Sequence, residues 1–197
     1  KETQFSVGGS GIEEALGNYW NKKEILKERK SWPAIEKANP LLVVSGSCSP
    51  VTAKQIEFAK ANGFEEVVID AVAICNSDST DNEISNTINN YLQQKNVIVH
   101  TGTKQTENLS SEKLGTTLGT IAKHAVEVNN LQRVVIAGGD TSSYAARAME
   151  IDAVEMIAPV VSGAPLCKAY SNNKAIDGLE VNFKGGQVGC EDYFGLF

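Results

Sequence analysis

The sequence predicts an α/β fold with three layers: a mostly parallel sheet with helices on both faces, and a strand-rich C-terminal part. Two observations predict it. Short runs rich in Val and Ile alternate with longer segments whose apolar residues recur at helical spacing. Strands that are joined by helices form parallel sheets covered on both faces. A chain of 197 residues is long enough for one well-buried domain with at most a small appendage.

Strands and helices are expected to alternate through the middle of the chain. Pro50 suits the first turn of a helix and Gly63 its C-terminal stop, while Ile84, Ile88 and Leu92 fall on one helical face. From about residue 151 onward the tail is typical of strand-rich hairpins. The expected strands span residues 40–47, 65–71, 96–101 and 133–139, and the expected helices span 50–63, 80–95, 111–128 and 141–149.

Two regions of unequal size are predicted. Residues 1–39 form a connector, with a short helix in GIEEALGNYWNKKEI followed by a charged stretch that ends before Pro40. Residues 40–197 form the main domain. The chain begins with Lys1 rather than Met, so we expect that a segment ahead of it was removed or never resolved.

Composition excludes several classes of function. A net charge of −6 and a pI near 5.0 argue against nucleic acid or an anionic membrane as the partner. No apolar run approaches the roughly 20 residues of a membrane span, and no signal peptide is visible. Two histidines and four cysteines without a CxxC pair argue against a zinc site, so no metal ligands are assigned. We therefore expect a cytoplasmic protein with reduced thiols at Cys48, Cys75, Cys167 and Cys190.

The stretch RVVIAGGDTSSYAARAM joins an apolar strand to a helix through an unusual turn. Gly138 and Gly139 carry no Cβ, and Asp140 and Thr141 follow with side-chain oxygens. Free backbone N–H groups at a helix N-terminus bind anions, and glycine lets an anion approach them. The alternative is an ordinary turn in which Asp140 or Thr141 caps the helix.

Two further turns have similar chemistry. SGSCSPVT places Gly46, Ser47 and Ser49 between a strand and a helix, and KGGQVG places Gly185 and Gly186 after a strand. Ligands of open α/β sheets bind at the carboxyl ends of the strands, where such turns meet. Neither a Walker A loop nor GxGxxG occurs. The three turns together predict a phosphate or nucleotide site.

Four blocks in this order resemble the C-terminal, nucleotide-binding domain of the four-carbon acid sugar kinases: LLVVSGSCSPVTAKQIEFAKANGF, VVIAGGDTSSYAARAM, VSGAPLC and FKGGQVGCEDYF. The resemblance covers about residues 40 to 197. That family phosphorylates acids such as threonate, erythronate and 3-oxo-tetronate with ATP. The leading SVGGSGIEEAL resembles the segment that joins the family's two domains, although it has GGSG in place of GSSG.

The resemblance implies which residues contact ATP and Mg²⁺. ATP contacts fall on Ser47 or Ser49, on the loop 138–141, and on Gly185 or Gly186. Backbone N–H groups of glycines and hydroxyl groups are suitable donors to phosphate oxygens. One of the two serines is expected to bind phosphate and the other, Ser49, to cap the helix that begins at Pro50.

Other candidates have more than one interpretation each. Gly163, with Ala164, lines the adenine or the end of the sheet, or else forms a turn before Pro165. Asp140 acts through Mg²⁺, binds a ribose hydroxyl, or caps its helix. Lys184 neutralises phosphate charge, or is an ordinary surface lysine.

The two histidines, His100 and His124, are interpreted as structural. No catalytic residue is assigned, because the family's N-terminal domain, which binds the sugar acid and carries the expected catalytic carboxylate, has no counterpart here. The expected partners are therefore ATP, a small sugar acid, this missing domain, and in one arrangement a second copy in a homodimer. The isolated chain is expected to bind nucleotide but to turn over poorly.

Two other functions stay open at this stage. The loops of a non-catalytic nucleotide- or anion-binding module would have the same composition. A sugar-phosphate enzyme of another class, such as an isomerase or aldolase, would use them for its substrate's phosphate. Such chemistry calls for a cluster of Lys, His or metal ligands, and near these turns the sequence offers only Lys168 and Lys184 and no cluster.

Overall fold

A computed structural model describes residues 8, 10–27, 29, 31–76, 82–102 and 110–197 of the chain. The chain divides into two compact units, residues 1–32 and 33–197. The described part of the first unit contains the helix α1 (Ser10–Lys22), which confirms a helix in this stretch. Its apolar face, which includes Ile12 and Leu16, is exposed.

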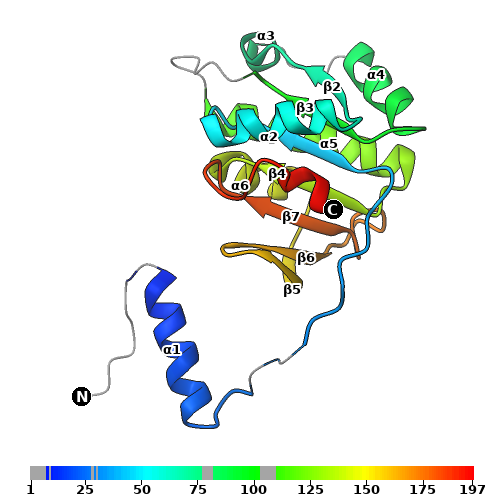
Figure 1. Cartoon of the computed structure of the whole chain (residues 1–197). Helices are drawn as coiled ribbons and strands as arrows, with labels where there is room; N and C mark the ends of the chain where they lie inside the picture. Colours follow the sequence, from blue (N-terminus) through cyan, green and yellow to red (C-terminus); the bar gives the residue numbers. More distant parts are fainter. Residues whose placement is uncertain (1–7, 9, 28, 30, 77–81, 103–109) are drawn as a thin grey trace. The chain divides into compact units, whose positions relative to one another are not determined.

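The second unit is built on one sheet (Figure 1). In the described chain the strand order is β2-β3-β1-β4-β7-β6-β5. The five strands from β2 to β7 in this order run parallel, whereas β6 is antiparallel to β7 and β5 is antiparallel to β6. The strands are β1 (Leu42–Ser45), β2 (Glu65–Val68), β3 (Val97–His100), β4 (Arg133–Ala137), β5 (Ala153–Val161), β6 (Ala164–Tyr170) and β7 (Glu180–Lys184).

Helices cover both faces of this sheet, so the three-layer α/β prediction is confirmed. Buried side chains of α4, α5 and α6 pack on one face, and those of α2 and the short 3₁₀ helix η1 pack on the other (Figure 1). The helices are α2 (Pro50–Ala61), α3 (Ala71–Asn76), α4 (Asn82–Leu92), α5 (Ser111–Asn129), α6 (Gly139–Ala148) and η1 (Tyr193–Leu196).

Two features of the fold differ from the sequence prediction. The helix α3 was not predicted, because six residues are too few to show a helical period. The C-terminal part forms the expected hairpin from β5 and β6, but β7 joins the parallel core as the neighbour of β4. Pairing between distant strands is decided by tertiary packing and leaves no local signal.

The central strands end at the same level. Ser45 of β1 is the register partner of Ala137 in β4, and Ala137 is in turn the partner of Lys184 in β7. All residues of β1 and β4 are buried, as expected for parallel strands covered on both faces. The turns that follow these three strands are therefore brought together at one edge of the sheet.

At the opposite edge of the sheet, Arg133 at the start of β4 holds three other parts of the chain. Its buried guanidinium lies 2.7 Å from Glu180 Oε2, and it donates to the carbonyl oxygens of Glu36 (2.7 Å) and Phe197 (3.4 Å). The Ala38 N–H also donates to Phe197 O at 2.9 Å. Residues 33–39 and the C-terminus are thus attached to the start of β4.

Glycines let α5 and α6 pack closely. A Cβ added to Gly115 would lie 2.7 Å from Tyr144 Cβ, and one added to Gly119 would lie 2.5 Å from Ala145 Cα. Such distances are shorter than any stable contact, so only glycine permits this approach. The approach draws together the N-termini of the two helices, Ser111 and Gly139.

We predict that Gly119→Ala lowers the free energy of unfolding by about 1–3 kcal/mol, because the added methyl group forces the two helices apart. The loss occurs although alanine is the better helix former by about 1 kcal/mol. Urea unfolding followed by circular dichroism measures it. Gly195→Ala is the control, since a Cβ there meets nothing within 4 Å. An equal change in both variants would contradict the close packing of α5 against α6.

Candidate functional site

A cavity of about 330 Å³ lies at the carboxyl edge of the central strands. The turns after β1, β4 and β7 all contribute to its wall, as does the start of α5. The three turns selected from the sequence therefore meet in one place. The lining residues are Gly46, Ser47, Ser111, Leu114, Gly138, Gly139, Asp140, Thr141 and Gly186.

Three of the lining glycines lie where no side chain fits. A Cβ on Gly46 would clash with Thr141 Oγ1, and a Cβ on Gly138 would lie 2.8 Å from the same oxygen. A Cβ on Gly186 would lie 2.5 Å from Ser47 Oγ. At Gly46 and Gly186 glycine is thus required for close approach between turns that follow different strands, and at Gly138 it is required within the turn after β4.

The N-terminus of α6 supplies backbone donors. Its first helical hydrogen bond runs from Ser142 N–H to Gly138 O at 2.8 Å. The N–H groups of Gly139, Asp140 and Thr141 come before that bond, so the helix offers them no acceptor. All three residues line the cavity, where these donors and the positive end of the helix dipole favour an anion.

The expectation that Asp140 or Thr141 caps this helix is wrong. The N-cap is Gly138, with φ of 119°, and no side chain accepts a capping hydrogen bond. Asp140 and Thr141 lie inside the first turn, because the helix begins two residues earlier than predicted. A positive φ suits glycine, and the absence of a side-chain cap leaves the first N–H groups to a ligand.

The two serines after β1 have different roles, and Ser49 has the capping role that was predicted for it. Its side chain caps α2 by accepting from Val51 N–H at 3.2 Å. Ser47 is buried and lines the cavity, and its Oγ accepts from Ser49 N–H at 3.3 Å. Because that bond uses a lone pair of Ser47 Oγ, its hydroxyl can still donate to a ligand in the cavity.

Charge on the cavity wall is sparse. Among the described residues that line the cavity, Asp140 is the only charged one, and it is exposed at the start of α6. An anion in the cavity would be held by N–H groups and hydroxyls, with Asp140 repelling it unless a cation lies between. Among the described residues, no group of three His, Cys, Asp or Glu is placed to hold a metal ion by itself.

Besides Ser49, which caps α2, two predicted site residues lie outside the cavity wall. Gly163 is exposed in the turn of the β5–β6 hairpin, with φ of 79°, and does not line the cavity. The turn interpretation of Gly163 therefore fits its position. Gly185 is half-buried next to Gly186, and its carbonyl accepts from Val188 N–H at 3.1 Å. It shapes the loop on which Gly186 lies.

Lys184 is not a surface lysine, as one interpretation of the sequence held. It is fully buried at the end of β7, on the side of the sheet covered by α2 and η1. Its Nζ donates to Thr52 Oγ1 and to Gly185 O, both at 3.1 Å. Burial lowers the pKa of Lys184 from 10.5 to about 8. The sequence carried no sign of this, since a single lysine after a strand is usually exposed.

The histidines are consistent with structural roles. His100, buried at the end of β3, bonds Glu66 Oε1 through Nε2 at 2.9 Å and accepts Gly102 N–H through Nδ1 at 3.0 Å. His124 is exposed on α5. Neither lines the cavity.

Sequence reasoning missed the contribution of α5. Ser111 and Leu114 line the cavity at the start of this helix, whose N-cap Ser110 accepts from Lys113 N–H at 3.2 Å. The serine pair ahead of an apolar helical period was a usable signal of a helix start. Its position beside α6 depended on the tertiary packing at Gly115 and Gly119.

Comparison with known proteins assigns the family. Residues 42–194 match the family model of the nucleotide-binding C-terminal domain. The chain is 33% identical over 98% of its length to the 3-oxo-isoapionate kinase of Paraburkholderia graminis. This chain belongs to the four-carbon acid sugar kinase family. Within that family it matches the nucleotide-binding C-terminal domain, which is the half that the four sequence blocks resembled.

Two further relatives support the assignment. The chain is 27% identical over 77% of its length to the D-threonate kinase of Salmonella typhimurium, and 25% identical over 98% to its 3-oxo-tetronate kinase. It spans 45%, 40% and 47% of the three kinases, which is about half of each.

Two solved structures have a fold similar to the described architecture. A Haemophilus influenzae protein of the DUF1537 family superposes with a TM-score of 0.68 at 18% identity, over 96% of this chain and 46% of that one. A DUF1537 protein from Bordetella bronchiseptica was crystallised with bound citrate as a domain-swapped dimer. It superposes with a TM-score of 0.69 at 19% identity, over 82% of this chain and 40% of that one. At this identity the likeness concerns the fold.

Two further expectations from the sequence concern the cysteines and membrane-spanning helices. Among the described side chains, Cys48, Cys167 and Cys190 form no disulfide, whereas the side chain of Cys75 lies outside the described residues. In the part of the chain that the structure describes, none of the helices is long and apolar enough to cross a bilayer.

We predict that replacing Ser47 and replacing Ser49 have different effects, the first on ligand binding and the second on stability. Ser49→Ala removes a helix cap and should lower the free energy of unfolding by about 1 kcal/mol. Ser47→Ala should change stability less, and weaken the binding of inorganic phosphate or nucleotide by about tenfold, the effect of one charge-assisted hydrogen bond. Urea unfolding and calorimetric titration on both variants separate the two roles. Equal effects on both measurements would contradict the division.

Proposed function

We propose that this chain is the ATP-binding half of a kinase that phosphorylates a small sugar acid, of the four-carbon class or close to it, with Mg²⁺. One observation carries the proposal: loops from three strands and the N-terminus of α6 form a single cavity whose wall consists of backbone donors, hydroxyls and glycines. The three related kinases support the substrate class.

The cavity is suited to the phosphate groups of the nucleotide. The N–H groups of Gly139, Asp140 and Thr141 and the Ser47 hydroxyl are donors that reach phosphate oxygens without a charged side chain. The volume of about 330 Å³ fits part of a nucleotide rather than all of it, so the base and ribose extend beyond the wall. Gly163, in a hairpin turn at the same edge of the sheet, is a candidate neighbour for them.

Mg²⁺ fits the donor set in one way. Asp140 is the only carboxylate that the described residues place on the wall, and together with phosphate oxygens and waters it can complete the octahedral oxygen shell that Mg²⁺ prefers. The ion would neutralise charge between the phosphates and Asp140. The exposed position of Asp140 also allows another role, in which its carboxylate accepts a hydrogen bond from a ribose hydroxyl.

The role of this half in the reaction is positioning. Phosphoryl transfer needs an acceptor hydroxyl in line with the terminal phosphate, and charge stabilisation around that phosphate. The residues of the cavity hold and orient the phosphates. No histidine or lysine lines the cavity in the described part of the chain, and Asp140 is best used for the cation. The base that activates the sugar acid is therefore assigned to the other half of a full-length kinase.

Calorimetric titration with ATP and ADP, with and without Mg²⁺, tests the proposal. Wild-type protein should bind both, and bind ATP more tightly when Mg²⁺ is present. Gly139→Val should weaken binding by at least about tenfold, because its side chain fills the space that the phosphates need. A Cβ at Gly139 meets nothing within 4 Å, so the variant should fold normally.

Gly195→Val is the matched control, because Gly195 lies beside a different cavity that also includes Leu41 and Asn96. It should bind nucleotide as the wild type does. A folded wild-type chain that binds neither nucleotide would contradict the proposal. Equal weakening in both variants would place the nucleotide elsewhere.

A further inference from the structure

The loop that carries Gly186 into the cavity is held from behind by a buried cation. Lys184 immediately precedes this loop and is 0% exposed, the most complete burial of any lysine in the described chain. Its Nζ donates to Gly185 O and to Thr52 Oγ1, both at 3.1 Å, and Thr52 Oγ1 donates onward to Gly186 O at 2.9 Å. Both carbonyl oxygens of the glycine pair are therefore bound, directly or through Thr52, to one ammonium group.

The direction of these carbonyls fixes the direction of the amides. In a trans peptide, C=O and the following N–H point to opposite sides, and the only cis bond among the described residues is Asn39–Pro40. With Gly185 O and Gly186 O turned toward Lys184 and Thr52, the N–H groups of Gly186 and Gln187 point away from them. Gly186 is the residue of this loop that lines the cavity.

Among the described residues the ammonium group has no carboxylate partner. None of the ion pairs in the described part of the chain includes Lys184. Beyond its two hydrogen bonds it lies 5.6 Å from the centroid of the Tyr193 ring and 5.8 Å from that of Phe194, which stabilise a cation only modestly. A buried charge without a counterion is costly, and a negative charge nearby lowers that cost.

The groups that face Lys184 leave this charge unbalanced. From η1 they are the Tyr193 and Phe194 rings, from α2 the Thr52 hydroxyl, and from β4 the register partner Ala137. Burial raises the pKa of Tyr193 to about 12, so that phenol is neutral near pH 8.

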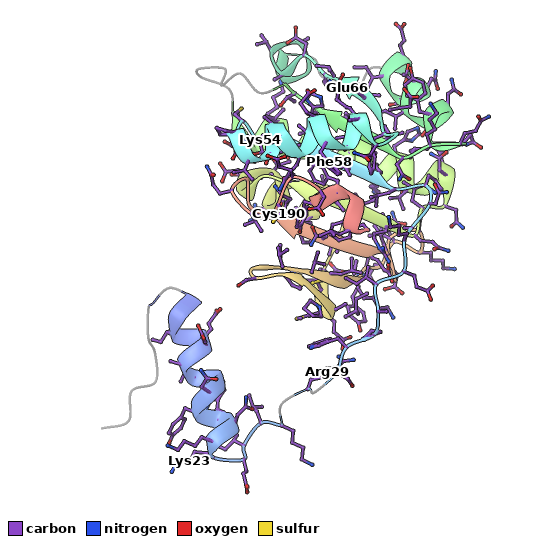
Figure 2. All side chains as sticks on the ribbon, in the orientation of Figure 1. Lys23, Arg29, Lys54, Phe58, Glu66 and Cys190 are labelled. Atoms are coloured by element: carbon purple, nitrogen blue, oxygen red, sulfur yellow. The ribbon has the colours of Figure 1, made fainter. Side chains whose placement is uncertain are left out.

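The described charged groups on the adjoining elements lie at the surface or at the far end of their strands, as Arg133 does at the start of β4. Lys54 of α2 pairs with Glu191 at 3.5 Å, with both side chains well exposed. Figure 2 labels Lys54 together with Cys190, the residue before Glu191. This exposed pair gives no counterion to the buried ammonium.

We infer that Lys184 is a positioning residue of the phosphate site: through Gly185 O and Thr52 it turns the N–H groups of the glycine loop toward the cavity, and its buried charge is compensated by the phosphate bound there. The inference rests on the proposed nucleotide site and deepens it. Lys184 touches the loop and not the ligand, so it acts on binding through the backbone.

A pH effect follows that a purely structural lysine would not produce. Phosphate bound on the cavity side of the loop favours the charged ammonium, so binding raises the pKa of Lys184 above its value of about 8 in the free protein. At pH 8 the protein must then take up protons as it binds. As the pH rises through about 8 and Lys184 loses its proton in the free protein, affinity must fall.

The test is calorimetric titration of the 197-residue chain with ADP at pH 8, in buffers of different ionisation enthalpy. The dependence of the observed enthalpy on the buffer gives the protons taken up. Wild-type protein should take up a fraction of a proton. Lys184→Met should lose that uptake and bind about 10- to 100-fold more weakly, as expected for the loss of an interaction with a charged group.

Two variants serve as comparisons. Lys168→Met removes an exposed lysine from the neighbouring strand β6 and should match the wild type in affinity and proton uptake. Thr52→Val keeps the ammonium and cuts the link to Gly186 O, so it should weaken binding yet retain proton uptake. If Lys184→Met does not fold by circular dichroism, Thr52→Val and the wild-type affinity between pH 7 and 9 decide the matter.

The outcomes separate this inference from the proposed function. Nucleotide binding with the same proton uptake and affinity in Lys184→Met as in wild type would overturn the role of Lys184 and leave the nucleotide site standing. Wild-type affinity that stays constant between pH 7 and 9 would overturn it as well. A folded wild-type chain that binds no ADP would overturn both.

Discussion

Close backbone approach at the carboxyl ends of β1, β4 and β7 is the constraint on which the site depends. The three strands end in register, and their turns then come closer than side chains allow. Glycine is present at each of the tight positions, Gly46, Gly138 and Gly186. The result is a wall made largely of peptide groups, which can bind a phosphate with fixed dipoles rather than with charged side chains.

Much of this could be predicted from the sequence, because the signals were local. Apolar runs and helical periods gave the strands and most helices, and the alternation gave the parallel sheet. The turns at Gly138 and Gly139, at Ser47 and at Gly186 were identified as one site, since carboxyl ends of parallel strands share an edge. Ser49 was correctly expected to cap α2 because Pro50 follows it.

The remainder depended on tertiary structure. The insertion of β7 beside β4 decides that Gly186 faces Ser47, and no local pattern in the tail predicts a parallel partner. Lys184 could be interpreted as a surface residue until the rings of Tyr193 and Phe194 were seen to cover it. The capping role expected of Asp140 failed because α6 begins two residues earlier, on a glycine with positive φ.

Backbone amide chemical shifts, recorded by NMR while ADP is added, test most directly whether peptide groups of the three turns bind the phosphates. The largest shifts should fall on Gly139, Asp140 and Thr141, followed by Ser47 and Gly186. Shifts confined to the cavity at the opposite edge of the sheet, lined by residues such as Leu41, Asn96 and Phe197, would contradict it.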